Sequence, residues 1–254
     1  MGRLTPAVLR TIDILELFLT EGPPLTAPAI AQATGFPRTS VHELLATLTA
    51  RNYLQRDEPT GTYTLGPPVL RLGNAYSARF DLLAAANRYA ASLAATVGET
   101  ASVAIREGAD VFYLAKAQTR DVVGIPSVVG HRLPANCTSL GKVLLADLTD
   151  VELNSLFPNP EHLPALTTHS ITSLTALQNE LRSVRLAGAA TEHEESSYAL
   201  CCAAAPIRSP SVGVIAAISV SVPRTQWEQR DEGFWVDTVK AAAARFSTQL
   251  GATN

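Results

Sequence analysis

The chain has 254 residues, of which 46% are hydrophobic and 17% are charged, and its formal net charge is −3. The length predicts about two domains, each able to bury its own core, and the composition is that of a globular protein. The slightly acidic balance excludes bulk electrostatic attraction as a basis for nucleic-acid binding, so only local placement of basic residues supports that function.

The chain carries no pattern that favours a membrane or secretory protein. Its longest apolar run, residues 212–222, is too short to cross a bilayer, and residues 1–25 lack the order of a signal peptide. Three cysteines, an odd number, do not describe a disulfide framework. We therefore expect a cytoplasmic protein with free thiols and no membrane partner.

The first part of the chain predicts three helices joined by short turns. Residues 6–20 place Val8, Ile12, Leu15 and Leu19 at helical spacing, which predicts their burial. Thr26 is a plausible N-cap for a second helix over 27–34, and Gly35 stands where a C-terminal glycine is expected. A third helix, from about 37 to 52, buries Val41, Leu44, Leu45 and Leu48.

A β-hairpin follows, with strands at 53–56 and 62–65 around the turn at 57–61. Three helices with a short turn before the third, followed by a hairpin, is the order of a winged helix-turn-helix. A helical stretch over roughly 69–97 then connects to the rest of the chain. It is long enough to link two domains and to contribute to a dimer interface.

Beyond residue 99 the pattern changes to alternation. Strands are predicted at 100–107, 111–118, 200–207 and 212–222, and helices at 139–148, 150–157, 173–187 and 232–250. The two kinds of element mix without regular βαβ repetition. The fold class predicted is therefore α+β, with an antiparallel sheet flanked by helices.

The third helix has an outward face suited to a DNA groove. With Val41 at zero on a helical wheel, Thr39, His42 and Glu43 fall opposite the apolar sector. Arg38 can reach a phosphate or a guanine, and Ser40 is short enough to approach closely. The competing interpretation is that Thr39 and Ser40 only cap the helix and Arg38 is solvated.

The hairpin offers further contacts to the DNA backbone or minor groove, although each residue could equally be a solvated hairpin residue: Arg56, Thr60, Thr62 and Tyr63. The net charge of this region does not favour DNA binding, because residues 1–66 carry five arginines against six acidic residues. A ligand-binding module whose head does not bind DNA therefore stays an alternative.

Two features of the second half predict a small-molecule pocket. Residues 136–142, NCTSLGK, begin a helix that Asn136 or Cys137 would cap, and free amides at residues 138–140 could bind a carboxylate. Ser219 and Ser221 alternate with valines, so both hydroxyls face the same side of a strand. The ordinary alternative for each serine is a satisfied core hydroxyl.

The run EHEESSYALCC at 192–202 supports a rival class, a metal-assisted or cysteine-dependent hydrolase that uses Cys202 and His193. No C-x-x-C spacing is present, and adjacent Cys201 and Cys202 on a strand point to opposite faces. We therefore expect no enzyme activity, no metal site and no cofactor.

Three ordered motifs resemble the IclR family of bacterial transcriptional regulators. They are residues 25–73, beginning LTAPAIAQATGFPRTSVHELL; residues 130–146, GHRLPANCTSLGKVLLA; and residues 188–207, GAATEHEESSYALCCAAAPI, followed by AAISVSVP. The resemblance implies a winged helix-turn-helix domain at 1–66, a linker helix at 67–82 and a GAF-like effector domain at 83–254. It also implies a homodimer or tetramer that binds operator DNA and controls a catabolic operon, most simply as a repressor.

The resemblance also implies which residues bind the effector, which is expected to be a small organic acid and, by our preference, a hydroxylated aromatic acid. They are Val122, Ile125, Ser139, Leu140, Glu192, Cys202, Ser219 and Ser221. The chain departs from the resemblance at Glu43, where a basic residue is expected. Glu43 could accept from a cytosine amino group, pair with Arg38 or Arg51, or lower the affinity for DNA.

Overall fold

The computed structural model describes residues 4–78, 81–118, 128–210 and 213–251. The chain forms two compact units, Met1–Asp81 and Leu82–Asn254. The predicted positions Val122 and Ile125 lie outside the described residues. Within the described ranges, no helix combines the length and hydropathy that crossing a bilayer requires.

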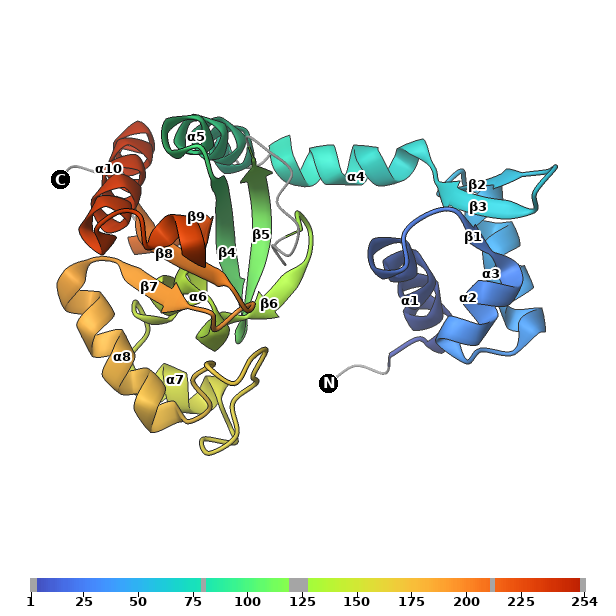
Figure 1. The fold of residues 1–254 in the computed structure, drawn as a ribbon. Coiled ribbons are helices and arrows are strands. Elements are labelled where there is room, and N and C mark those ends of the chain that lie inside the picture. The colour runs from blue at the N-terminus through green and yellow to red at the C-terminus, as the bar shows by residue number, and fades with distance from the viewer. Residues whose placement is uncertain (1–3, 79–80, 119–127, 211–212, 252–254) are drawn as a thin grey trace. The chain divides into compact units, whose positions relative to one another are not determined.

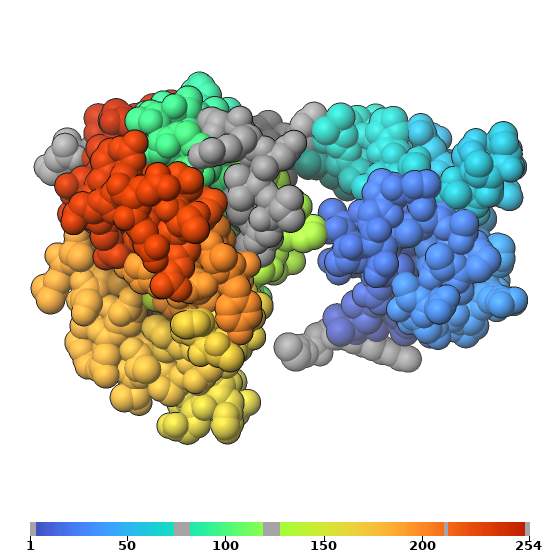
Figure 2. Space-filling model, viewed as in Figure 1, coloured from blue at the N-terminus to red at the C-terminus, as the bar shows by residue number. Residues whose placement is uncertain are grey.

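The first unit is a three-helix domain with a small sheet (Figure 1). Its helices are α1 (Pro6–Thr20), α2 (Ala27–Thr34) and α3 (Arg38–Ala50), and a further helix, α4 (Pro67–Ala78), follows the sheet. The strands β1 (Leu25–Thr26), β2 (Leu54–Asp57) and β3 (Thr62–Leu65) pair antiparallel in the order β1-β3-β2. The β2–β3 hairpin projects from the helices, as the cyan segment of this unit shows in Figure 2. The predicted winged helix-turn-helix order is confirmed.

Local chemistry sets the short turn between α2 and α3. The Thr26 side chain accepts a hydrogen bond from the Ala29 amide at the start of α2. Gly35 ends α2 in the left-handed region, at φ 69°, and its amide donates to the Ala31 carbonyl. A residue with a side chain is strained at such an angle, so a glycine here permits the immediate reversal into α3.

The prediction for the buried face of α1 is wrong for three of its four residues, because only Leu15 packs, partly buried, against the core. Ile14 and Phe18 enter the core, whereas Val8, Ile12 and Leu19 are 55%, 46% and 51% exposed. The helix is apolar around more than one face, and the core takes the face that carries the larger aromatic residue. The stripe with the most regular spacing is left at the surface of this unit.

The second unit is built on a six-stranded antiparallel sheet in the order β6-β5-β4-β9-β8-β7. The long strands are β4 (Thr100–Glu107), β5 (Asp110–Ala117), β8 (Leu200–Ser209) and β9 (Gly213–Pro223), and they confirm the predicted strands closely. The short edge strands β6 (Arg132–Pro134) and β7 (Ala190–His193) were not predicted. Three or four residues give too little alternation to be recognised.

Helices cover both faces of this sheet, which Figure 1 shows. One face packs against α5 (Asp81–Val97), α9 (Arg224–Trp227) and α10 (Glu232–Gln249). The other packs against α6 (Ser139–Leu145), α7 (Asp150–Leu156) and α8 (Leu174–Ala187). The sheet is therefore the middle layer of three, and the predicted α+β class is confirmed. The stretch predicted as one helix over 69–97 is described as two helices, α4 and α5.

The start of α6 differs from the prediction. A single 3-10 turn, η1 (Ala135–Cys137), precedes the helix, and Thr138 is the N-cap, whose hydroxyl accepts from the Gly141 amide at 2.9 Å. Asn136 instead donates to the carbonyls of Pro164 and Ile171, 2.7 and 2.9 Å away. The Thr138 amide is also occupied, because it donates to Ala135. The predicted run of free amides is therefore shorter than expected.

Candidate functional site

The outward face of α3 is exposed as predicted. Arg38, Thr39, His42 and Glu43 are exposed and Ser40 is half-buried, while Val41, Leu45 and Leu48 pack into the core. The N-cap of α3 is Pro37, and no side chain caps it. The interpretation of Thr39 and Ser40 as capping residues is therefore wrong, and their hydroxyls stand at the first turn of a helix whose amides are also available.

Among the described residues of its unit, Glu43 has no arginine partner. In the described part of the chain, its carboxylate forms no ion pair with Arg38 or Arg51, although its backbone carbonyl accepts from the Thr47 hydroxyl at 2.8 Å. The interpretation of Glu43 as half of a pair with these arginines is wrong. Its charge lies unneutralised on the predicted DNA-facing side.

The hairpin presents a smaller polar surface than the sequence predicts. Arg56 is exposed and pairs with Glu58 at 3.4 Å, and the hydroxyls of Thr60 and Thr62 are 2.7 Å apart. Tyr63 is only 7% exposed and packs in the core with Ile30 and Leu54. The prediction that Tyr63 reaches DNA is wrong, because alternation along β3 turns it inward.

Six of the eight predicted effector positions come together in one pocket of the second unit. Four further residues line it, of which only Thr138 was named in the sequence prediction, for its amide. The lining consists of Ser139, Leu140, Glu192, Cys202, Ser219 and Ser221, together with Tyr113, Thr138, Ser196 and Leu200. The pocket lies between the start of α6 and the face of strands β5, β9, β8 and β7.

Strand register explains why these side chains converge. Glu192 lies opposite Cys202, Cys202 opposite Ser221, and Ser221 opposite Thr100, which places all four on one face of the sheet. Helix α6 reaches this face because Gly141 lets η1 approach closely. A Cβ at position 141 would lie only 2.1 Å from the Ala135 carbonyl oxygen.

Glu192 is a buried carboxylate whose oxygens are occupied by its own loop. It is 0% exposed and accepts from the Ser196 hydroxyl at 2.7 Å and from the Glu195 amide at 2.8 Å. These bonds hold its charge inside the pocket. Burial, with a further contribution from Glu192, raises the pKa of Cys202 well above its usual value and also raises the pKa of Tyr113. Both groups are neutral donors at physiological pH.

Lys142 connects the elements that surround the pocket through a buried ion cluster. Its side chain is 2% exposed, and its ammonium contacts Glu195 at 2.6 Å and Glu180 at 3.2 Å and donates to the Thr191 carbonyl at 3.2 Å. Burial raises the pKa of Glu195, while Lys142 acts in the opposite direction. This cluster ties α6 to α8, to β7 and to the loop that follows β7.

The pocket is nearly closed. The open space within its lining is about 10 Å³, which is at the limit for a single water molecule. The space between these side chains is therefore smaller than an organic acid of several heavy atoms.

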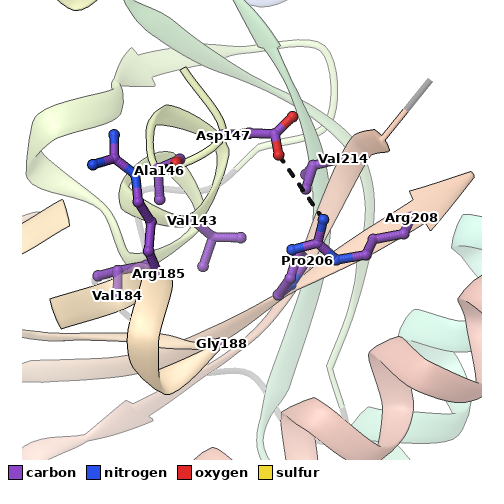
Figure 3. A pocket seen from close by; sticks show the side chains of 9 residues that line it. All are labelled: Val143, Ala146, Asp147, Val184, Arg185, Gly188, Pro206, Arg208 and Val214. Carbon is purple, nitrogen blue, oxygen red and sulfur yellow. Dashed lines mark hydrogen bonds and ion pairs between the residues drawn. The ribbon is translucent and has the colours of Figure 1, made fainter. Parts of the chain in front are cut away.

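A second cavity lies at the opposite end of α6, between that helix, α8 and the β8–β9 hairpin (Figure 3). It encloses about 140 Å³ and contains none of the predicted positions. Arg185 donates to the carbonyls of Ala146 and Leu148, at 2.7 and 2.8 Å, and Arg208 stands 3.9 Å from Asp147. Arg185 therefore satisfies the exposed carbonyls that follow α6.

The hydrolase interpretation is not supported by the geometry. His193 lies opposite Cys201, so it is on the other face of the sheet from Cys202. The His193 side chain is 53% exposed and contacts Glu232 at 3.1 Å. Among the described residues, no group of three or more potential metal ligands comes together. Cys202 and His193 therefore cannot act as a nucleophile and base on one substrate.

The sequence analysis missed the part of this face that β4 and β5 contribute. Thr100 and Ser102 lie opposite Ser221 and Ser219, and Lys116 lies opposite Ser102. Partial burial lowers the pKa of Lys116. The two-residue alternation of 100–104 could have indicated that Thr100 and Ser102 share a face, but only the register shows which face.

The fold joins a helix-turn-helix domain with an exposed polar face on its third helix to a separate unit that contains a polar pocket, which is the architecture of the class of DNA-binding regulators with an effector domain. Residues 7–58 match the IclR helix-turn-helix domain, and residues 74–248 match the bacterial transcriptional regulator IclR C-terminal domain. The chain belongs to the IclR family of bacterial transcriptional regulators.

Individual proteins agree with this assignment. The chain is 32% identical to the Pca regulon regulatory protein of Pseudomonas putida, over 88% of this chain and 78% of that protein. It is 29% identical to the transcriptional repressor AllR of Salmonella typhimurium, over 96% and 90%. The structure of an IclR homologue from Microbacterium hydrocarbonoxydans, complexed with 4-hydroxybenzoate, matches 97% of this chain and all of that one with a TM-score of 0.85 at 24% identity.

The buried thiols give a first prediction. Burial raises the pKa of Cys137 and Cys202, and it raises that of Cys201 to about 11. Because the thiolate is the reactive form, the three thiols of the native protein should react with Ellman's reagent at about pH 8 far more slowly than a free cysteine. All three should react at once in concentrated guanidinium chloride. A rapidly reacting thiol in the native protein would contradict the burial of all three cysteines.

Proposed function

We propose that this protein is a homo-oligomeric repressor of a catabolic operon, which holds operator DNA through α3 and responds to a small hydroxylated acid bound in the Glu192 pocket. The observation that carries the proposal is the convergence of Ser139, Leu140, Cys202, Ser219 and Ser221 on one buried, polar pocket. The proposal of a repressor, as opposed to an activator, is supported by the similar protein AllR, which is named as a transcriptional repressor.

The chemistry of the pocket favours an acid that also carries hydroxyl groups. The lining offers the hydroxyls of Tyr113, Ser219 and Ser221, and Lys116 lies on the same face of the sheet. A hydroxyl can both donate and accept, so this surface suits carboxylate and hydroxyl groups alike. Glu192 would repel a bound carboxylate. Its oxygens already accept hydrogen bonds from the Ser196 hydroxyl and the Glu195 amide, which weakens that repulsion.

The closed state of the pocket supplies the coupling. A ligand that needs more than about 10 Å³ binds only a conformation in which α6 and the sheet have separated. It therefore stabilises that conformation by its differential affinity, commonly about 1–3 kcal/mol, which changes operator affinity about 5- to 150-fold. Lys142 makes the change cooperative, because α6 cannot move without disturbing Glu195 and Glu180.

Exposed apolar residues of the first unit support a homo-oligomer. On α1 they form the regular stripe that the core leaves outside, and α4 adds two leucines. They are Val8, Ile12, Leu19, Leu70 and Leu72, each at least 46% exposed. Apolar residues gathered on helices in this way are typical of a surface that another protein covers, and the proposed occupant is a second copy of the chain.

The recognition helix gives a direct prediction. Arg38→Ala should weaken binding to a DNA fragment from upstream of the gene by about 5- to 150-fold in a gel-shift assay, because it removes a phosphate or guanine contact. Arg51→Ala, an exposed arginine just beyond the other end of α3, is the matched control and should change affinity little. Unchanged affinity in Arg38→Ala, with the fold intact by circular dichroism, would favour a module that does not bind DNA.

Glu43 gives a second prediction about the same helix. Because the carboxylate is exposed and unpaired with Arg38 or Arg51, its charge should act on DNA alone. If it reads a cytosine, Glu43→Gln and Glu43→Arg should both lose discrimination at one operator position, at a cost of about 1–3 kcal/mol. Uniformly tighter binding of Glu43→Arg across all operator variants would show instead that the native charge only lowers affinity.

The pocket gives a third prediction. Ser221→Leu should fill the nearly closed space beside Cys202 and abolish the response to effector, while DNA binding in the gel shift is retained. Ser155→Leu, at an exposed position of α7, is the matched control and should respond normally. Calorimetric titration with 4-hydroxybenzoate measures the loss directly, and an unaltered response in Ser221→Leu would place the effector elsewhere.

A further inference from the structure

Two hydroxyls on β4 are buried without a hydrogen-bond partner. Thr100 and Ser102 are each 1% exposed, and neither Thr100 Oγ1 nor Ser102 Oγ makes a hydrogen bond in the described structure. A buried hydroxyl without a partner loses its bonds to water and gains nothing in return. Two of them on one strand therefore call for a functional explanation.

The position of these two hydroxyls in the sheet suggests what that function is. Thr100 lies opposite Ser221, and Ser102 lies opposite Ser219. Residues directly opposite in an antiparallel pair share a face, with Cβ atoms about 4.5–5.5 Å apart. Since Ser219 and Ser221 line the pocket, the two partnerless hydroxyls continue its polar surface onto the next strand.

We propose that Thr100 and Ser102 are specificity-determining residues of the effector pocket, which read the hydroxyl groups of the ligand. The inference rests on the proposed function and deepens it by naming the residues that select for the hydroxyl groups of such an acid. Such groups donate and accept hydrogen bonds, so they satisfy both side chains once α6 and the sheet separate. A bare hydrocarbon acid leaves both side chains unpaired, and sites of this kind discriminate strongly against the analogue that lacks the hydroxyl.

Two other buried hydroxyls of the same unit, which have a structural role, are fully hydrogen-bonded. Thr167 and Ser170 are each 8% exposed. The Thr167 hydroxyl donates to the Glu194 carbonyl at 2.6 Å, and the Ser170 hydroxyl donates to the Glu195 carbonyl at 2.8 Å and accepts from two amides. Thr100 and Ser102 lack any such arrangement, although they are buried more deeply.

This contrast gives a test that needs no ligand. Thr100→Val and Ser102→Ala remove an unpaired hydroxyl, so each should leave Tm unchanged or raise it by roughly 2–4 °C. Thr167→Val and Ser170→Ala, the matched controls with the same chemical change, should lower Tm, because each leaves buried partners unsatisfied. If Thr100→Val and Ser102→Ala lower Tm as far as the controls do, their hydroxyls are structural and the inference is overturned.

The second test measures ligand discrimination in the full-length protein. Calorimetric titration with benzoate, 4-hydroxybenzoate and 3,4-dihydroxybenzoate should show a hydroxylated acid bound at least about 10-fold more tightly than benzoate. The double variant Thr100→Val, Ser102→Ala should lose that preference while keeping its affinity for benzoate and for DNA. Equal binding of all three acids, no binding of either hydroxylated acid, or a preference that survives in the variant would overturn the inference.

Failure of the inference can be distinguished from failure of the proposed function. If Ser221→Leu abolishes binding while the β4 variants bind like the native protein, the pocket is the effector site and only the role of Thr100 and Ser102 is wrong. If Ser221→Leu also binds like the native protein, the effector site itself is misplaced and both proposals fall.

Discussion

The ion cluster around Lys142 is the constraint on which the effector unit depends. An ammonium that is almost wholly withdrawn from water requires compensating charge, and it finds two carboxylates and a carbonyl on different elements, Glu195, Glu180 and Thr191. Removing Lys142 would leave the largely buried Glu195 carboxylate without its cation, and breaking such a buried pair commonly costs about 3–5 kcal/mol. Strand β7, which carries Glu192, and the loop that follows it are thereby held against α6, and they form one wall of the pocket. The Lys142 cluster thus fixes the position of α6 relative to the sheet. The compactness of the unit comes instead from the apolar layers on the two faces of the sheet.

The sequence predicts local structure well wherever one kind of interaction decides it. Thr26 and Gly35 fix the ends of α2 through their own side-chain and backbone chemistry, so the bounds of that helix follow from the sequence. The register that brings Glu192, Cys202 and Ser221 together required the resemblance to a family, because pairing partners far apart in the chain leave no local signal. Thr100 and Ser102 were missed for that reason: their alternation indicates a shared face, while the identity of that face depends on β9.

The errors have a common physical origin in competition between equally suitable residues. On α1 the regular stripe of Val8, Ile12 and Leu19 loses to Ile14 and Phe18, since packing against α2 and α3 favours the larger side chain. At the start of α6 three successive residues could cap, and Asn136 is instead used by the carbonyls of Pro164 and Ile171. Asn136, which does not cap the helix, makes long-range hydrogen bonds instead. The apolar residues of α1 that do not enter the core stay exposed at the surface.

The exposed carboxylate of Glu43 and the unpaired hydroxyls of Thr100 and Ser102 are local costs that folding alone does not explain. Glu43 forms no ion pair with Arg38 or Arg51 on the surface proposed to face DNA, and Thr100 and Ser102 are desolvated without partners. Departures from local consistency concentrate where a protein meets its ligand, because the missing partner is supplied by that ligand. In the proposals above, this partner is a hydroxyl group of the effector for Thr100 and Ser102, and a base edge or none for Glu43. An effector that satisfied the two buried hydroxyls would relieve a cost that the ligand-free pocket bears, and that relief would add to its differential affinity for the open conformation.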